Sequence, residues 1–157
     1  MRQNSDRLTE LKRQLSLDAS DGKDFDDITR LLATSLQVPI VMVNLLDSER
    51  DLFQSSIGQL GRASPAATSM CEIFFNTVDD LVVVEDTIAS PEFAQHPKVL
   101  GEPFIRFYAA ARLVVNGQTI GTLCACDVQP RQLTDGQMAE MRALANAAME
   151  LMSLRLP

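Results

Sequence analysis

Three cysteines and one histidine are the side chains in this 157-residue sequence best suited to nucleophilic, redox or metal chemistry. Cys124 and Cys126 lie two positions apart in an apolar run. On a β-strand such residues face the same side but diverge too far for an easy disulfide with each other. A redox reaction therefore requires Cys71 to meet Cys124, because a buried cysteine otherwise behaves as a small apolar residue.

The single histidine, His96, is remote in sequence from all three cysteines and precedes Pro97. A lone loop histidine is more typical of the polar surface than of a haem ligand. The cysteines are odd in number and lack CxxC spacing, which is typical of a reducing compartment and argues against zinc. Asp86 and Arg106 are the charged candidates for orienting a ligand. Without a Ser-His-Asp triad, phosphate-binding glycine loop or histidine-rich motif, we expect no catalytic residue and no metal site.

Composition narrows the class of partners. A formal charge of −7 and a pI near 4.6 disfavour binding to nucleic acid or to anionic membranes, because proteins that bind them usually present a basic surface. There is no apolar run of membrane-spanning length, and the first residues are polar or charged, so we expect a cytoplasmic protein. With 46% hydrophobic residues the chain is expected to form one domain over 1–157, with its core at about 24–152.

The elements that must position these side chains centre on a β-hairpin. Asn116 and Gly117 can adopt the two positive φ angles of a type I′ turn, and apolar runs flank them over 105–115 and 118–128. Because both runs are apolar on both faces rather than alternating, we expect the hairpin to lie centrally in a sheet covered above and below.

Helices are expected on both sides of this hairpin in the sequence. Apolar residues at helical spacing predict an N-terminal helix within 1–17 and a C-terminal helix over 135–154. The second of these follows a capping box formed by Thr134 and Gln137. Between them, Asp24 is expected to N-cap a third helix, whose buried face holds Phe25, Ile28, Leu32 and Leu36.

The remaining elements are a set of strands and an irregular crossover. Ser69 and Glu72 have capping-box spacing, which predicts a short helix there. The crossover over 86–104 is rich in proline, and Ser90-Pro91 can begin one helical turn in it. Mixed helices and strands in this order predict an α+β fold with a central, mainly antiparallel sheet, with further strands over 40–46, 51–57 and 81–85.

Several of these segments carry a family resemblance, namely Arg106 to Ala109, Asn116-Gly117, Ile120 to Cys124, Asp127 and Pro130 to Leu133. They resemble the C-terminal half of a bacterial GAF domain, of the type found beside diguanylate cyclases and sensor histidine kinases. Upstream motifs follow the order of that family, so the resemblance covers roughly 8–152; they are Ser69 to Cys71, Val83 to Asp86 and Phe93 to Gly101. It implies a six-stranded sheet with terminal helices on one face and a short helix plus crossover on the other.

The resemblance also implies a pocket beneath the short helix and crossover. A long irregular segment in a compact domain is more often functional than structural, which favours the same place. The alternative is a collapsed core without a ligand. Ala110 and Arg112 depart from the residues that the family usually has, and a buried Arg112 would need an acidic partner or water. The expected lining is Cys71, Phe74, Phe75, Asp86, Phe93, Tyr108, Ala110, Thr122 and Cys124.

What the resemblance implies about function is a cytoplasmic sensory or regulatory domain. It would bind a small molecule or sense redox state and transmit that state to an output module in cis or in trans. Its cofactor is unknown: a bilin needs a histidine beside a cysteine, and the Asn-Lys-Phe-Asp-Glu set of cyclic-nucleotide-binding members is absent. Two alternatives remain, a cysteine-dependent free methionine sulfoxide reductase, whose cysteine spacing differs from the spacing here, and a ligand-free dimerisation module.

A homodimer through the terminal helices is expected on the same analogy. Each terminal helix carries an apolar stripe, and an isolated amphipathic helix is stable only when it packs on something. Terminal helices from two protomers can form a four-helix contact. The expected interface residues are Leu8, Leu11, Leu15, Met141, Ala145, Ala148 and Met152.

Overall fold

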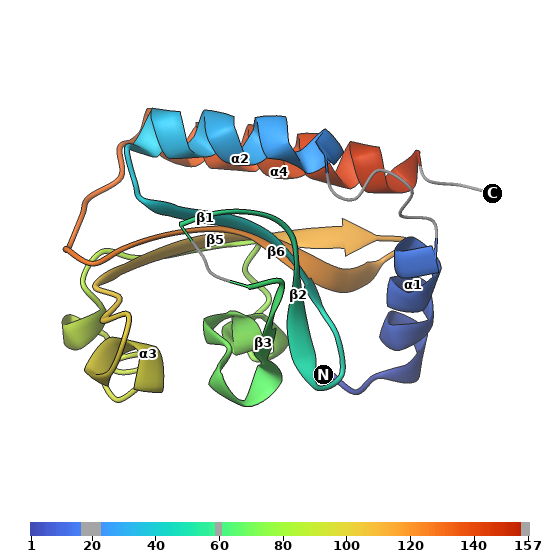
Figure 1. Cartoon of the computed structure of the whole chain (residues 1–157), viewed down its shortest axis with the longest axis horizontal. Coiled ribbons are helices and arrows are strands. Elements are labelled where there is room, and N and C mark those ends of the chain that lie inside the picture. Colours follow the sequence, from blue (N-terminus) through green and yellow to red (C-terminus); the bar gives the residue numbers. More distant parts are fainter. Residues whose placement is uncertain (17–22, 59–60, 155–157) are drawn as a thin grey trace.

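A six-stranded antiparallel sheet organises the protein. The structure, a computed structural model, describes residues 1–16, 23–58 and 61–154. The strands lie in the order β3-β2-β1-β6-β5-β4, with helices on both sides of the sheet (Figure 1). This arrangement confirms the predicted α+β class. The strands are β1 Ile40–Leu46, β2 Arg50–Ile57, β3 Ala63–Pro65, β4 Leu81–Val84, β5 Phe107–Val115 and β6 Gln118–Asp127.

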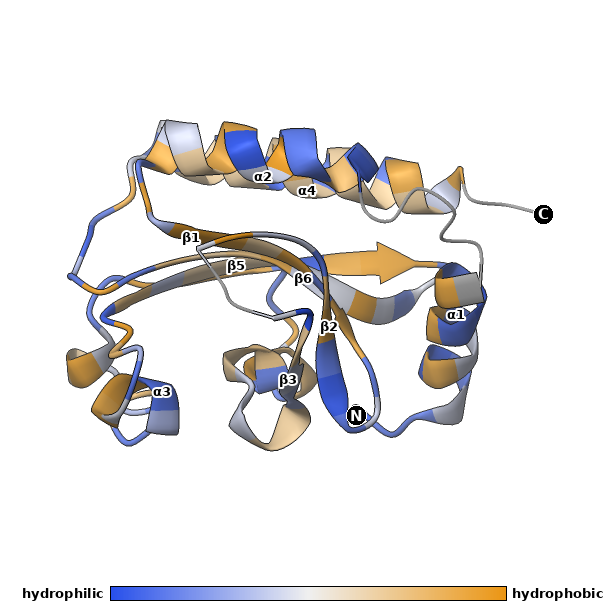
Figure 2. Cartoon of the chain, viewed as in Figure 1, coloured by the Kyte–Doolittle hydropathy of each residue, from blue (hydrophilic) through white to orange (hydrophobic). Residues whose placement is uncertain are grey.

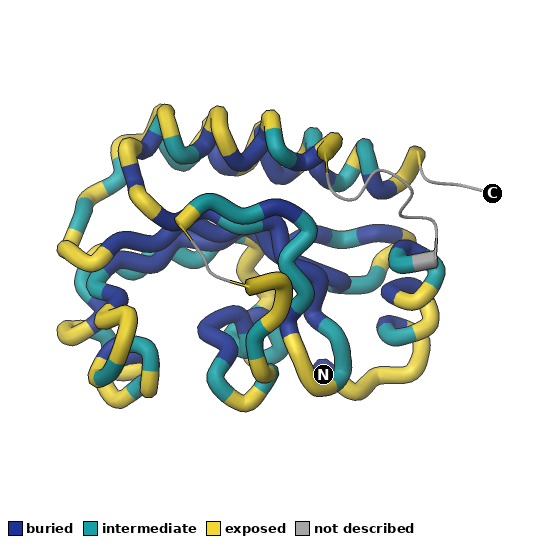
Figure 3. Tube along the Cα trace, in the orientation of Figure 1, coloured by how far each residue is buried: buried dark blue, intermediate teal, exposed yellow. Residues whose placement is uncertain are grey.

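The predicted hairpin forms the centre of this sheet. Asn116 and Gly117 connect β5 to β6 with φ values of 52° and 76°, the two positive angles that a type I′ turn needs. Both strands are buried along most of their length, because β1 and β4 flank the pair and other elements cover its faces (Figure 3). Apolar residues accordingly concentrate along β1, β5 and β6 (Figure 2).

Two helices cover one face of the sheet, and a third lies at its end. Helices α2 (Lys23–Leu36) and α4 (Asp135–Ser153) lie side by side over the face, while α1 (Ser5–Ser16) lies beside the β5–β6 turn (Figure 1). Asn116 Nδ2 donates to Glu10 of α1 at 3.2 Å, and Gln14 Nε2 donates to the carbonyl of Met152 at 3.1 Å. Helix α1 therefore joins the hairpin turn to the end of α4. None of the helices within the described ranges is long and apolar enough to cross a membrane.

The helix ends match the sequence in one case and differ in another. In α4 the predicted capping box is present: Gln137 N donates to Thr134 Oγ1 at 3.1 Å, and Thr134 N donates to Gln137 Oε1 at 2.9 Å. Helix α2 begins at Lys23, so Asp24 lies in its first turn rather than at the N-cap. There its negative charge interacts favourably with the positive end of the helix dipole. The predicted buried face of α2 is confirmed for Phe25, Ile28, Leu32 and Leu36.

Most residues expected at the dimer interface lie instead in the core of this chain. Leu8 and Leu15 are partly buried against that core, and the other residues of the set are at most 3% exposed within it: Leu11, Met141, Ala145, Ala148 and Met152. One protomer buries much of both stripes, because α1, α2 and α4 share a single apolar core with the sheet. An interface between two intact copies would need residues other than these five buried ones.

Short helices cover the opposite face of the sheet (Figure 1). They are the 3₁₀ helices η1 (Ala66–Thr68), η2 (Met70–Phe75) and η3 (Thr87–Ala89) and the single-turn helix α3 (Pro97–Leu100). Ser69 caps η2 as expected, but its hydroxyl accepts from Cys71 N at 3.1 Å, and Glu72 binds Arg2 instead of closing a capping box. The element is also a 3₁₀ rather than an α-helix.

The crossover contains two proline-initiated turns. The predicted one begins at Pro91, where the Ser90 carbonyl accepts from Phe93 N at 3.2 Å and from Ala94 N at 2.8 Å. The second is α3, which begins at Pro97 and is capped by His96, whose Nδ1 accepts from Lys98 N at 3.1 Å. Strand β3 had no counterpart among the strands read from residue patterns. It pairs only at the sheet edge and contains Pro65, which lacks the N–H that a central strand needs.

Arg112 of β5 fastens η2 and the loop after it to the sheet. Its guanidinium donates to the carbonyls of Phe74 (2.8 Å), Thr77 (2.7 Å) and Asp79 (2.9 Å). The sequence predicted that a buried Arg112 would need an acidic partner or water, and Asp80 Oδ1 lies 3.6 Å from Arg112 Nε. The carbonyls nevertheless provide most of the contacts. Arg112 thus positions η2 on the sheet face opposite to the one that α2 and α4 cover.

Candidate functional site

A small cavity of about 60 Å³ lies between η2 and the sheet. Its walls come from β1, β2, β5, β6, η2 and the segment around α3. Apolar side chains such as Ile40, Met42 and Phe53 form much of the lining. The polar and thiol-bearing lining residues are Asn44, Asp51, Cys71, Lys98, Tyr108, Cys124 and Cys126. The volume limits a ligand to a handful of non-hydrogen atoms, because an engineered cavity that holds benzene is about 150 Å³.

The cavity has a thiol wall. Cys71 Sγ lies 3.1 Å from Thr122 Oγ1 and accepts from the hydroxyl of Tyr108 at 3.2 Å. Asn44 Nδ2 donates to Cys71 Sγ at 3.9 Å and to Cys124 Sγ at 3.4 Å, so the two thiols that a redox reaction would need share one amide donor. All three cysteines are free and buried.

These thiols and the neighbouring phenol are held in their neutral forms. The hydrogen bond with Cys124, together with burial, raises the pKa of Cys71 well above its ordinary value. The hydrogen bond with Cys126 does the same for the pKa of Cys124, to which burial adds. Burial is the main cause that raises the pKa of Tyr108. Since the thiolate is the nucleophilic form of cysteine, Cys71 and Cys124 are poor nucleophiles at neutral pH.

Asn44 is a buried polar residue of the cavity lining. It lies in β1 opposite Thr122 of β6 and is 2% exposed. Its Nδ2 donates to Cys124 Sγ at 3.4 Å, whereas its Oδ1 has no hydrogen-bond partner among the described residues. Strand β6 approaches here very closely: a Cβ on Gly121 would lie 2.1 Å from the Asn44 carbonyl oxygen. The backbone around Asn44 is therefore tightly packed against β6, while its side-chain Oδ1 has no hydrogen-bond partner among the described residues.

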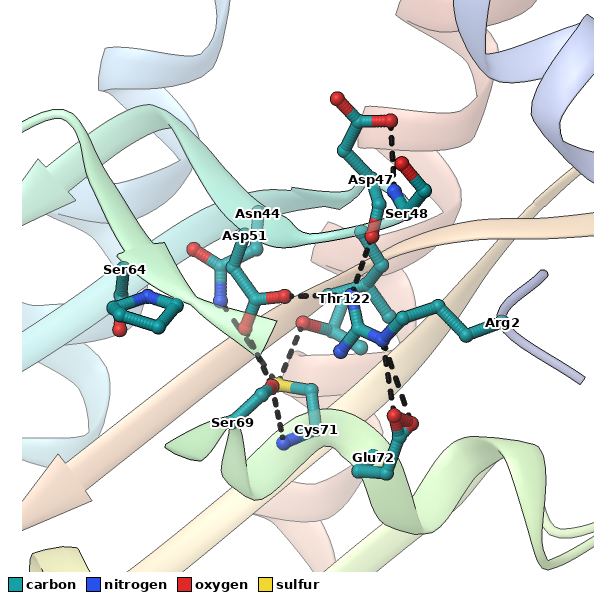
Figure 4. A network of polar contacts seen from close by, with 12 residues as sticks. Arg2, Asn44, Asp47, Ser48, Asp51, Ser64, Ser69, Cys71, Glu72 and Thr122 are labelled. Atoms are coloured by element: carbon teal, nitrogen blue, oxygen red, sulfur yellow. Dashed lines mark hydrogen bonds and ion pairs between the residues drawn. The ribbon is translucent and has the colours of Figure 1, made fainter. Parts of the chain in front are cut away.

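A polar network connects the cavity wall to the N-terminal residues (Figure 4). Arg2 Nη1 pairs with Asp51 Oδ1 at 3.0 Å, and Arg2 Nε pairs with Glu72 of η2 at 2.9 Å. The other oxygen of Asp51 accepts from the hydroxyl of Ser69, whose side chain also caps the helix that carries Cys71. The network joins β2, η2 and the N-terminus at one wall of the cavity.

A second arginine of the N-terminal segment supports this attachment. Arg7 is 2% exposed and donates to the carbonyls of Arg2, Leu46 and Thr119. The ring of Phe75 packs against both guanidinium groups, whose carbons lie 5.3 Å (Arg2) and 5.0 Å (Arg7) from its centroid. Residues 1–7 are thus bound to both the sheet and η2.

The structure brings some of the predicted pocket residues together. Cys71, Tyr108 and Cys124 line the cavity, and Thr122 reaches it through its contact with Cys71. Ala110 belongs to the same apolar cluster without lining the cavity. These residues come from the hairpin and η2, the two elements that the sequence placed at the pocket.

Other predicted pocket residues lie elsewhere. Phe74 packs under Arg112, with the guanidinium carbon 5.2 Å from the ring, and Phe75 packs against the N-terminal arginines. Asp86 caps η3 and pairs with Arg106 at 3.1 Å. Phe93 contacts the Tyr108 ring at 5.3 Å and borders a separate depression of about 670 Å³ between η2 and β4.

Sequence reasoning missed Asn44, Asp51, Lys98 and Arg2. Asn44 had a usable signal, since it is the only polar residue in the run Ile40–Leu46. The other three had none, because charged residues near turns and at a chain end are ordinary surface features. Within the described ranges, no group of histidine, cysteine and acidic side chains is arranged to hold a metal ion.

Comparisons with known proteins agree with this architecture. A curated relative, a cyclic di-GMP phosphodiesterase of Pseudomonas aeruginosa, is 36% identical over 123 residues, which are 76% of this chain and 20% of the relative. The GAF domain of an Acinetobacter phosphoenolpyruvate-protein phosphotransferase superposes with a TM-score of 0.69 at 16% identity, covering 96% of this chain and 95% of that one. The free methionine-R-sulfoxide reductase of Neisseria meningitidis, solved with its substrate, gives 0.67 at 17% identity over 92% and 87%.

At these low identities the two solved structures bear on the fold alone. The curated relative is much longer, and this chain spans about a fifth of its length. The model of the family described as GAF domain matches residues 23–151, which include every strand, α2 and nearly all of α4. The chain belongs to the GAF domain family.

Proposed function

We propose that this GAF domain is a sensory module that binds a small molecule in the cavity beneath η2. One observation carries the proposal: Asn44 Oδ1 is buried at the cavity and unpaired within the described part of the chain. A buried acceptor without a hydrogen-bond partner destabilises the fold by about 1–3 kcal/mol. Its presence at a cavity favours a ligand that donates a hydrogen bond to it. The cavity is also mostly apolar with a few convergent polar groups, which is usual for ligand sites.

The N-terminal residues supply a route from this cavity to an output. Asp51 lines the cavity and binds both Ser69 and Arg2. A ligand that displaces η2 would alter these contacts and, through Arg2 and Arg7, the attachment of α1. Helix α1 in turn contacts the end of α4 through Gln14. Both terminal helices are thus available to transmit the state of the cavity to an output unit in cis or in trans.

The similarity to part of a cyclic di-GMP phosphodiesterase supports a role in signalling. The acidic charge of −7 favours a partner other than nucleic acid or an anionic membrane, and the free thiols fit the cytoplasm. A homodimer belongs to the same proposal. It would form through the outward faces of α2 and α4, because the inward faces are occupied by the core.

Ligand binding is favoured over redox chemistry by the state of the thiols. A hydrogen bond with Cys124 raises the pKa of Cys71, one with Cys126 raises the pKa of Cys124, and burial adds to both; neither thiol is exposed. Reactive cysteines usually lie in partly exposed, electropositive surroundings. We therefore propose that the domain does not turn over methionine sulfoxide.

Native mass spectrometry of protein purified from its own host tests the proposal. We expect a retained small molecule in the wild type and in Cys126→Ser, and its loss in Cys126→Leu, whose larger side chain fills the cavity. Circular dichroism establishes that both variants are folded. A wild type that carries nothing, and that no small molecule stabilises, contradicts a ligand-binding role and leaves the ligand-free dimerisation module.

A further inference from the structure

Lys98 is a cation at the cavity that lacks an acidic partner. It is half-buried, and its Nζ donates to Ser64 Oγ at 3.3 Å, but no carboxylate of the described residues lies within ion-pair distance of it. Partly buried arginines in the same chain differ, since each has a carboxylate within 4.0 Å: Arg13, Arg106, Arg112 and Arg131. Arg7 likewise has no carboxylate within ion-pair distance among the described residues, but it donates to three backbone carbonyls, whereas the partner of Lys98 Nζ is the Ser64 hydroxyl. The position of Lys98 at the cavity can explain this difference.

The position of Lys98 is fixed by the backbone. Its N–H donates to His96 Nδ1 at 3.1 Å, and its carbonyl accepts from Ile105 N at 2.8 Å. The side chain extends from this braced turn to the cavity lining. A positive charge held in this way can bind an anionic group without first ordering a flexible segment.

The charges around the cavity leave room for one negative charge. Among the described lining residues Asp51 alone carries a carboxylate, and it is paired with Arg2 and accepts a hydrogen bond from Ser69. The thiols of Cys71 and Cys124 are neutral for the reasons given above. Lys98 is therefore the charged group of the lining that no ion pair among the described residues balances, which suits one anionic group on a ligand.

We infer that the ligand is a short hydroxycarboxylate, whose carboxylate pairs with Lys98 and whose hydroxyl meets the free half of the Asn44 amide. The inference rests on the proposed function, because it concerns the same cavity. The limited volume and the apolar walls leave space for a body of the size of glycolate or lactate.

Other ligand classes fit these groups less well. An amino acid would bring an ammonium group, and the one lining carboxylate is already paired with Arg2. A phosphate dianion would face a single lysine and no arginine within the lining, although phosphate sites usually combine several donors. Nucleotides and bilins exceed the space available.

Titration calorimetry with glycolate and three compounds of similar size tests the inference. Acetate lacks the hydroxyl, glycolamide lacks the charge, and glycine replaces the hydroxyl with an ammonium group. We expect glycolate to bind best, acetate about tenfold more weakly, and glycolamide and glycine not measurably, since a charge-assisted hydrogen bond is worth about 1.5–3 kcal/mol in general, or roughly ten- to a hundred-fold in affinity. Lactate extends the series by one methyl group.

Variants locate the binding. We expect Lys98→Met to weaken glycolate binding about ten- to a hundred-fold, Lys98→Arg to retain most of it, and Lys12→Met, at an exposed position on α1, to leave it unchanged. In Asn44→Leu, glycolate and acetate should bind equally, and unchanged thermal unfolding would show that the variant is folded. Equal binding of glycolate by the wild type and Lys98→Met overturns the inference.

The two proposals fail in different ways. If glycolamide or glycine binds in the cavity and no carboxylate of the hydroxyl series does, the ligand class is wrong and the sensory role stands. If none of the probes binds and native mass spectra of the protein from its own host are empty, both proposals are wrong.

Discussion

Arg2 and Asp51 are 49 positions apart in the chain, yet their side chains form a 3.0 Å ion pair that is 6% and 5% exposed. Such a pair is common in protein interiors only where both charges have further hydrogen bonds. Here Arg2 also donates to the Asp47 carbonyl at 2.8 Å, and Asp51 accepts from Ser69. The N-terminus is consequently part of the folded domain rather than a loose extension of it.

Breaking this pair should destabilise the fold strongly. Removal of one partner from a buried pair typically costs about 3–5 kcal/mol, because the other charge stays buried without compensation. We expect Arg2→Met and Asp51→Leu each to cost an amount of this order in urea unfolding, and the double variant to cost less than the sum. Arg30→Met is the matched control, since the Arg30–Asp27 pair is 65% and 76% exposed and such pairs are worth about 0–1 kcal/mol. If Arg2→Met unfolds like Arg30→Met, the pair is not formed in solution.

The cap formed by His96 should make stability depend on pH. Burial, and then the charge of Lys98, lower the pKa of His96 below its ordinary value of 6.5. A histidine with a lowered pKa in the folded state binds fewer protons there than in the unfolded chain, so stability is full above pH 6.5 and falls as the pH drops below it. His96→Asn keeps a capping side chain but cannot titrate.

We therefore expect the unfolding free energies of wild type and His96→Asn to differ by a constant amount above pH 6.5. Below that pH the wild type should lose stability relative to the variant. Urea unfolding at a series of pH values measures this difference. Parallel pH profiles for the two proteins would show that His96 does not act as the cap.

The buried thiols should react slowly with a disulfide reagent. Because hydrogen bonding, to Cys124 for Cys71 and to Cys126 for Cys124, and burial raise the pKa of both thiols, we expect little release of thionitrobenzoate from the native protein and rapid release in urea. A thioredoxin-coupled assay with free methionine sulfoxide should show no NADPH consumption above background. Sustained consumption that Cys71→Ser abolishes would favour the reductase alternative over the sensor.

The sequence predicted the scaffold better than the site, for a physical reason. Hairpin turns and helix caps are local signals, so Asn116-Gly117 and Thr134-Gln137 could be read directly. The cavity depends on contacts between distant segments. Arg2 meets Asp51 only after the chain has folded, and Lys98 lines the cavity only because the crossover returns to η2. The family analogy placed Phe74 and Phe75 in the pocket, but in the structure their rings pack against the guanidinium groups of Arg112 and Arg2 instead.

The hairpin turn gives a direct test of the central strands. Gly117 has a φ of 76°, and a left-handed conformation costs about 1–2 kcal/mol for a residue with a Cβ and more for a β-branched one. Gly117→Val should lower the free energy of unfolding by at least this amount, although nothing lies within 4 Å of the added Cβ. Gly136→Ala, in the first turn of α4, is the matched control and should stabilise by roughly 0.5–1 kcal/mol. An unchanged midpoint for Gly117→Val would mean that the turn has another conformation.

A homodimer of this domain must use residues that the core leaves free. Helices α2 and α4 present an outer face that includes Leu31, 55% exposed, and the small exposed residue Ala143. A two-fold axis over this face would join the α2–α4 pairs of two protomers in a four-helix contact. Light scattering should find a dimer for the wild type and a folded monomer for Leu31→Glu/Ala143→Glu. Leu11→Glu should instead unfold the protein, because Leu11 is 0% exposed in the core. A wild-type monomer at micromolar concentration rules out the dimer, and a double variant that remains dimeric moves the interface to another surface.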